Sequence, residues 1–148
     1  MNKPINSIAS VVFIVKDAIK AAETLLSLSK DGKMDTRLLH GRELKFMCSG
    51  KEPDFKCQCA SVTLEGLKIE FVQPLPGESS GWSECMAKYG HGVAQINVFT
   101  DNAKEAGEEM VKQGYKNIQS GVSPRFLIDI FDTHADCGFL IETLEKRE

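Results

Sequence analysis

VAQINVFTDNAKEAGEEM, residues 93–110, has a weaker copy near the start of the chain, IASVVFIVKDAIKAAETL at residues 8–25. Each copy contains a polar residue, an apolar run, a turn and then a helix rich in alanine and glutamate. A second pair, GLKIEF at 66–71 and GFLIET at 138–143, follows in the same order near the end of each half. Two matched segments in one order indicate a duplicated unit of strand, helix and strands.

The spacing of apolar and turn-forming residues predicts the elements of both halves. β-Branched and aromatic runs predict strands at residues 10–15, 34–39, 44–48, 55–64, 67–73, 95–100, 126–131 and 138–144. Helical spacing predicts helices at 18–28, 82–88 and 103–114, with Asp17 and Asn102 as N-caps. The pair Glu65-Gly66 predicts a two-residue hairpin turn. We therefore expect one domain, 1–148, with module one at 8–73, a linker at 74–92 and module two at 93–144.

Composition narrows the classes of function. Of the 148 residues, 42% are hydrophobic and 26% are charged, as in ordinary soluble domains. The net charge of −3 and the lack of a basic block argue against nucleic acid or a membrane as partner. Five cysteines without a secretory signal predict reduced thiols and a cytoplasmic protein. Cys57 and Cys59 lack the second Cys or His pair that a structural zinc site needs.

Strand alternation places one polar residue of each repeated strand on the sheet face that is turned away from the helices. These residues are Ser10, Glu70, Gln95 and Glu142. Their neighbours on that face, such as Val12 and Leu140, are mostly apolar. A polar cluster in apolar surroundings predicts a ligand pocket, and the alternative is an open sheet rim where both glutamates are solvated.

The predicted hairpin adds residues to the same face. With a two-residue turn, Ser61 lies opposite Glu70, and the odd-numbered residues from 57 to 63 share its face. The predicted pocket residues are Lys68, Asn97, Phe99, Cys59 and Ser61. Lys68 either pairs with a glutamate of the pocket in place of a metal, or reaches solvent at the sheet edge. Arg37 and Arg125 either meet an anionic substrate or are solvated.

Four segments carry a resemblance to a known superfamily. They are SVVFIVKDAIKAA (10–22), IEFVQPLPG (69–77), GHGVAQINVFTDN (90–102) and FDTHADCGFLIETLE (131–145). The chain resembles the vicinal oxygen chelate superfamily, which includes glyoxalase I, methylmalonyl-CoA epimerase, extradiol dioxygenases and bleomycin-resistance proteins. The resemblance implies an α+β fold, in which two βαβββ modules form one cupped mixed β-sheet with helices on the outside. It also implies a homodimer.

In enzymes of that superfamily, one residue from the first strand and one from the last strand of each module bind a divalent metal. Carried over, the metal ligands would be Ser10, Glu70, Gln95 and Glu142. The methylmalonyl-CoA epimerase and glyoxalase branch usually has histidine or glutamine in place of Ser10, and histidine in place of Gln95. The set found here contains only oxygen donors from hydroxyl, amide and carboxylate groups, which favour Mg²⁺, Mn²⁺ or Ca²⁺ and hold them weakly.

The resemblance implies an isomerase or lyase of the glyoxalase/epimerase type. Such an enzyme moves a proton next to a carbonyl of a small metabolite or thioester, assisted by the metal, with Glu142 and Glu70 as candidate catalytic groups. One rival is a metal-free small-molecule binding module of the bleomycin-resistance type, which Ser10 and Gln95 favour. Another is a structural dimer module whose cup is inert.

Overall fold

Two successive units of strand, helix and three strands build the protein. The computed structural model describes residues 3–148 and, for Val93, the backbone alone. The first unit contains β1 (Ser7–Ile14), α1 (Ala18–Ser27), β2 (Lys33–His40), β3 (Lys56–Leu64) and β4 (Leu67–Pro74). The second contains β5 (Gly92–Phe99), α3 (Ala103–Lys112), β6 (Asn117–Val122), β7 (Phe126–Phe131) and β8 (Leu140–Lys146). Helix α2 (Gly81–Tyr89) connects the units, and the short α4 (His134–Cys137) lies between β7 and β8.

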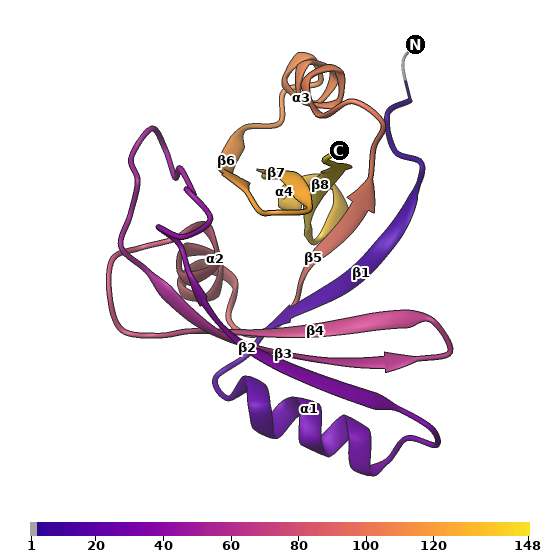
Figure 1. Cartoon of the computed structure of the whole chain (residues 1–148). Coiled ribbons are helices and arrows are strands. Elements are labelled where there is room, and N and C mark those ends of the chain that lie inside the picture. Colours follow the sequence, from indigo (N-terminus) through magenta and orange to yellow (C-terminus); the bar gives the residue numbers. More distant parts are fainter. Residues whose placement is uncertain (1–2) are drawn as a thin grey trace.

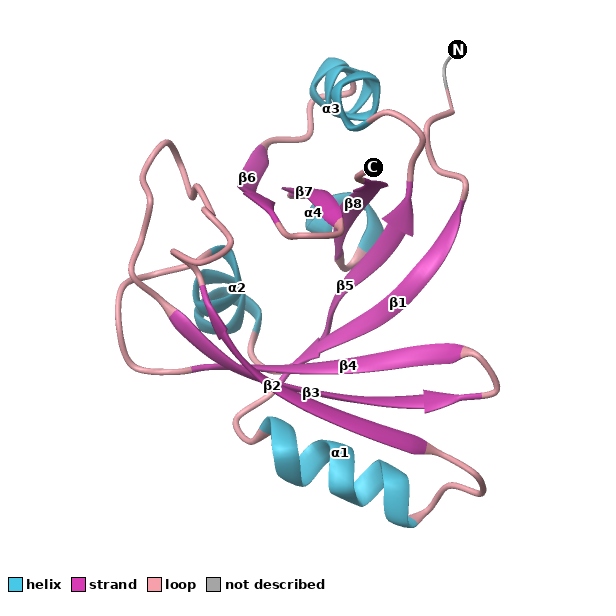
Figure 2. Cartoon of the chain, viewed as in Figure 1, coloured by secondary structure: helices cyan, strands magenta, loops and turns pink. Residues whose placement is uncertain are grey.

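All eight strands form one curved mixed sheet, in the order β2-β3-β4-β1-β5-β8-β7-β6. β1 is parallel to β4 and β5 is parallel to β8, while β1 and β5 join the two units as an antiparallel pair. Helices α1 and α3 lie on opposite outer sides of the molecule, with the curved sheet between them (Figures 1 and 2). The predicted fold class, an α+β cup with helices outside, is confirmed.

Local sequence signals fix the ends of the elements. Asp17 caps α1, because its Oδ1 accepts a hydrogen bond from the Lys20 amide at 3.0 Å. Asn102 caps α3 in the same way, by accepting from the amide of the residue three positions later at 3.0 Å. Glu65 and Gly66 have φ of 46° and 83°, as a type I′ turn requires. This turn sets the β3–β4 register as predicted, so the residues of 57–63 fall opposite their expected partners.

The sheet buries apolar side chains on both faces. Phe13, Phe71 and Val62 pack beneath α1 on the convex side. Val12, Cys57 and other residues of the concave side belong to a second core, which draws on both units. The alternation predicted from the sequence therefore assigns the two faces correctly, and the concave face is the interior of a cup. None of the helices within residues 3–148 has the length and apolar character needed to cross a membrane.

Three aromatic rings fill one end of the cup. Phe46 and Phe55 come from the loop between β2 and β3, and Trp82 comes from α2. Their ring centroids lie 5.6–5.9 Å apart, with Trp82 edge-on to the other two. The loop approaches so closely that a Cβ at Gly121 on β6 would lie 2.3 Å from the Phe46 ring. The absence of a side chain at residue 121 is therefore what lets this loop close the cup.

One predicted strand is wrong and one strand was missed, and the two errors are linked. Residues 44–48 are a loop and not a strand, since Lys45 and Ser49 have positive φ of 49° and 51°. Met47 exchanges backbone hydrogen bonds of 2.7 and 2.9 Å with Ser120 of β6, at the far edge of the sheet. β6 itself was not predicted, because its sequence NIQSGV has no apolar run. The loop that follows one edge strand thus pairs with the other edge strand.

Candidate functional site in the cup

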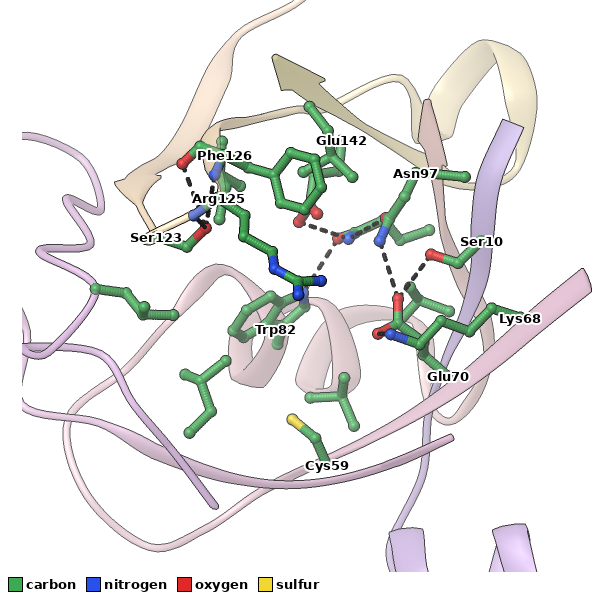
Figure 3. A pocket seen from close by; sticks show the side chains of 18 of the residues that line it. Ser10, Cys59, Lys68, Glu70, Trp82, Asn97, Ser123, Arg125, Phe126 and Glu142 are labelled. Carbon is green, nitrogen blue, oxygen red and sulfur yellow. Dashed lines mark hydrogen bonds and ion pairs between the residues drawn. The ribbon is translucent and has the colours of Figure 1, made fainter. Parts of the chain in front are cut away.

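The open end of the cup holds a cavity of about 310 Å³, to which both units contribute (Figure 3). Apolar residues form much of its wall, among them Val12, Leu39, Val72, Phe99, Phe126, Ile128 and Leu144. Polar side chains gather in one part of it, namely Ser10, Lys68, Glu70, Gln95, Asn97 and Glu142. An apolar cavity with a few convergent polar groups is the usual form of a small-molecule site.

Glu70 is surrounded by donors. Its Oε2 accepts hydrogen bonds from Ser10 Oγ at 2.7 Å and from Asn97 Nδ2 at 3.1 Å. Its Oε1 lies 3.3 Å from Nζ of Lys68, which projects from the same strand, β4. The Lys68 side chain is 47% exposed and that of Glu70 16%, so the lysine is the more accessible member of the pair, and both residues line the cavity. The structure thus contains the Lys68–Glu70 pair that the sequence offered as one of two alternatives.

Gln95 connects the second half of the network. Its Nε2 donates to Glu142 Oε2 at 2.9 Å and to Asn97 Oδ1 at 2.8 Å. Its Oε1 accepts from the indole Nε1 of Trp82 at 3.1 Å. Asn97 in turn donates to Glu70, so a continuous chain of hydrogen bonds joins the two glutamates. Because every polar atom of its amide has a partner, Gln95 is held in one orientation.

Glu142 differs from Glu70 in having an apolar environment. Its residue is 6% exposed, and Gln95 supplies its hydrogen bond. Burial raises the pKa of Glu142 from 4.5 to about 8, and the negative charge of Glu70 adds to the rise. The hydrogen bond from Gln95 and the positive charge of Arg37 oppose it. A carboxyl group of this kind can take up or release a proton near neutral pH.

The two cysteines of β3 face the cup but are unreactive. Cys57 is fully buried, and burial raises the pKa of its thiol to about 12. Cys59 lines the cavity, and burial raises the pKa of its thiol to about 11. Both thiols are therefore neutral at physiological pH and contribute wall rather than a nucleophile.

All four residues matched by the duplication line the cavity: Ser10, Glu70, Gln95 and Glu142. Of the predicted pocket residues, Lys68, Asn97, Phe99 and Cys59 line it as well. Ser61 does not; it lies two residues further along β3 than Cys59, in an adjoining pocket of about 90 Å³. Register alone could assign these residues to a face, but not to a position along it.

Trp82 is a site residue that the sequence reasoning missed. Its spacing on the linker helix predicts a buried stripe, and it is indeed only 5% exposed. Its indole N–H nevertheless fixes the amide of Gln95. The available signal was chemical: a buried indole needs an acceptor for its N–H group. Leu44, Phe46 and Ser123 were also missed, because loops bring them to the cavity, and so was Phe126, the first residue of β7.

The donor set does not fit the divalent metal that the resemblance implied. Within residues 3–148, no group of three or more His, Cys, Asp or Glu side chains could hold a metal ion. Gln95 directs its N–H groups toward the cup, while Trp82 occupies its carbonyl oxygen. Glu70 already faces the ammonium of Lys68, which a metal would have to displace. Serine adds only a poor ligand.

Comparison with solved structures identifies the fold. A methylmalonyl-CoA epimerase from Mycobacterium tuberculosis superposes with a TM-score of 0.68 at 16% identity, over 100% of this chain and 93% of the epimerase. A hypothetical protein from Bacillus halodurans C-125 gives 0.65 at 20% identity, over 95% and 94%. A methylmalonyl-CoA epimerase in complex with methylmalonyl-CoA and NH4+ gives 0.61 at 15% identity, over 96% and 95%. No protein-family model matches the chain, and no curated protein matches it by sequence.

The chain thus has the fold that its resemblance to the vicinal oxygen chelate superfamily implied. Among the proteins of that fold, the structures similar to it include several methylmalonyl-CoA epimerases. At identities of 13–20% these likenesses establish the fold, and the chemistry has to be argued from the cup itself.

Proposed function

We propose that the cup catalyses proton transfer next to the carbonyl of a small acyl compound or thioester, with Glu142 as the acid–base group. The observation that carries the proposal is the position of Glu142, buried at the wall of the cavity with a pKa raised to about 8. A base of that pKa is better matched to a carbon acid at neutral pH than a glutamate of ordinary pKa.

In the proposed reaction, the Glu142 carboxylate removes a proton from the carbon next to the carbonyl. The electron pair of the broken C–H bond forms the C=C bond of an enolate, and the negative charge moves to the carbonyl oxygen. The carboxylic acid of Glu142 then returns a proton to the enolate carbon. Return of the proton to the same face of the carbon gives exchange with solvent, whereas delivery to the opposite face, after the enolate has turned, or to a neighbouring atom gives an isomer. Where the adjacent carbon carries a leaving group, the enolate expels that group in place of reprotonation, and the result is an elimination.

Lys68 is the group proposed to stabilise the enolate oxygen. A cation at that oxygen lowers the barrier, because charge develops there only as the proton leaves. Glu70 holds the ammonium group at 3.3 Å, and Ser10 and Asn97 fix Glu70 in turn. In this assignment the first unit supplies the electrostatic part of the site, and the second unit supplies the base.

The structural neighbours support the substrate class. Several of them are methylmalonyl-CoA epimerases, and one was solved in complex with methylmalonyl-CoA. A cavity of about 310 Å³ lies at the small end of the range for ligand pockets. It therefore suits the acyl part of a thioester, with the carrier part outside the cup.

The proposal is tested by deuterium exchange in D₂O, followed by ¹H NMR, with methylmalonyl-CoA, propionyl-CoA and lactoylglutathione as substrates. Wild-type protein is expected to exchange the proton next to the carbonyl of at least one of them, at a rate that rises with pH toward about 8. Glu142→Gln should slow the exchange about 10²- to 10⁴-fold. Glu23→Gln, at an exposed position of α1, is the matched control and should leave the rate unchanged.

Two other outcomes would redirect the assignment. The metal-assisted form of the same reaction requires that EDTA abolish the exchange and that a divalent ion restore it; the metal-free proposal requires that EDTA have no effect. Binding of the compounds without any exchange would instead favour the metal-free binding module. That second candidate is supported by the hydrogen-bond chain between the glutamates, which would also suit a rigid binding site.

A further inference from the structure

Two arginines reach the cavity, one from each unit. Arg37 lies on β2, and Arg125 lies in the turn between β6 and β7. Within residues 3–148, neither guanidinium has a carboxylate oxygen within the 4.0 Å of an ion pair. By contrast, Arg42, which lies outside the cavity lining, pairs with Asp54 at 3.9 Å. Both arginines are exposed, and no ion pair within the described residues neutralises the charge of either, so both are able to bind an anion.

The turn that carries Arg125 is held firmly. Ser123 Oγ accepts from the Phe126 amide at 2.9 Å, and the backbones of these two residues are also joined, from the Ser123 amide to the Phe126 carbonyl, at 2.9 Å. Arg147 donates to the carbonyls of Ser123 and Arg125, at 2.9 and 2.8 Å. From this turn Arg125 extends across the cavity toward Trp82 (Figure 3). The backbone of the turn is therefore fixed, and the exposed Arg125 side chain extends from it into the cavity.

The positive charge of Arg37 influences the pKa values of groups inside the cup. Burial raises the pKa of Cys59 to about 11, and the charge of Arg37 is the largest influence that opposes this rise. Burial likewise raises the pKa of Glu142, and Arg37 again opposes it. Arg37 and Arg125 thus line one cavity, although they are far apart in the sequence, and the charge of Arg37 acts on groups of its wall.

The charges that line the cavity do not balance. Lys68 is paired with Glu70, so this cation and this anion cancel. Of the other charged residues that line the cavity within 3–148, Arg37 and Arg125 are positive and only Glu142 is acidic. The cavity therefore keeps a net positive charge whether Glu142 is protonated or not. The planar fork of a guanidinium matches a carboxylate with two parallel hydrogen bonds, which a lysine cannot supply.

We propose that Arg37 and Arg125 bind a free carboxylate of the substrate, which carries this group in addition to the carbonyl that reacts. The inference deepens the proposed function and rests on it for the nature of the reacting group. Arg125 and Arg37 are specificity residues in this assignment. They select a dicarboxylic half-thioester or an oxo-acid over a neutral acyl compound, and orient it with its carbon acid toward Glu142.

The experiment is calorimetric titration at constant ionic strength, with malonate and succinate as probes and with malonamide and succinamide as their neutral counterparts. Wild-type protein should bind at least one dianion and neither diamide. Arg125→Gln and Arg37→Gln should each raise the Kd of that dianion about 10- to 100-fold. Arg125→Lys should recover only part of the loss. Arg42→Gln, which removes an exposed arginine outside the cavity lining, is the matched control and should bind as wild type does.

The inference is overturned if neither dianion binds, if the diamides bind equally well, or if both glutamine variants keep wild-type affinity. Its failure is distinct from failure of the proposed function, because binding of these probes needs no catalysis. Glu142→Gln should keep the anion binding and lose proton exchange. For any substrate that exchanges, Arg125→Gln should raise KM much more than it lowers kcat; an unchanged KM would contradict the role of Arg125 and leave that of Glu142 intact.

Discussion

Replacing Glu142 by glutamine should make the folded protein more stable at alkaline pH. Glutamine has nearly the shape of glutamate and keeps an oxygen for the hydrogen bond from Gln95, which measures 2.9 Å in the wild type. It carries no charge at any pH, so the cost of placing an anion in the apolar cup disappears. The variant therefore separates the electrostatic cost of the carboxylate from its packing.

The size of the effect follows from the two pKa values of Glu142. The ordinary value is 4.5, and burial, with the charge of Glu70 as a second cause, raises it to about 8 in the folded protein. Between these values the folded protein holds a proton that the unfolded chain releases. The stability contributed by this proton is complete below pH 4.5 and is lost as the pH rises through about 8. At about 1.4 kcal/mol per pKa unit, the loss between about pH 5 and about pH 9 is on the order of 4 kcal/mol.

Urea denaturation at a series of pH values measures this loss. The only tryptophan of the chain, Trp82, is 5% exposed inside the cup and reports unfolding by its fluorescence. Glu142→Gln and wild type should have similar free energies of unfolding near pH 5, and the variant should be about 4 kcal/mol more stable near pH 9. Glu23→Gln, at an exposed position, should follow the wild-type curve. A difference between Glu142→Gln and wild type that stays constant across this pH range would refute the reasoning.

Two further predictions concern the loop that closes the cup and the metal. Gly121→Ala brings a Cβ to 2.3 Å from the Phe46 ring and should cost about 1–3 kcal/mol in urea denaturation. Gly107→Ala on α3, where the new Cβ meets no atom closer than 3.7 Å, should be neutral or stabilising, and equal effects of the two changes would contradict the close approach. Calorimetric titration of the wild type with Mg²⁺, Mn²⁺, Zn²⁺, Ni²⁺ or Co²⁺ should show no binding at millimolar concentration, while Ser10→His should gain affinity for the last three. Tight binding of zinc by the wild type would contradict the conclusion that the donor set of the cup does not fit a divalent metal.

The fold was predictable because the sheet faces obey a short-range rule. Residues such as Val12 and Phe13 alternate, and strand geometry sends them to opposite faces wherever the strand ends. The register of the β3–β4 hairpin is likewise set locally, by the two turn residues Glu65 and Gly66. The loop at 44–48 could not be assigned in this way, because its backbone partners lie in β6, more than 70 positions away. Its apolar residues resemble a strand, yet they pack on the aromatic end of the cup.

The sequence predicted most of the polar residues that line the site, but not the contacts between them. Matched positions in the two halves identified Glu70 and Glu142, and both line the cavity. The pattern offered pairing of Lys68 with a glutamate as one of two alternatives and could not decide between them, and nothing in it indicated that Trp82 would fix the amide of Gln95. Those contacts depend on side-chain directions and on a linker helix whose place in space is set by the whole sheet. The sequence also could not predict where along a strand face a residue lies: Ser61 was expected in the main cavity and lies in an adjoining pocket.

The difference between the two halves explains how equivalent positions acquire different chemistry. In the first unit Lys68 pairs with Ser10 of the neighbouring strand, and in the second unit Leu140 pairs with Gln95 in the same register. The glutamate two residues further on therefore has an ammonium group beside it in one half and a buried leucine in the other. Water and a cation stabilise a negative charge, whereas an apolar wall disfavours it, so one carboxylate anchors a charge and the other is left to exchange protons. Two units of the same topology can in this way supply, at equivalent positions, the electrostatic group and the base that the proposed function needs.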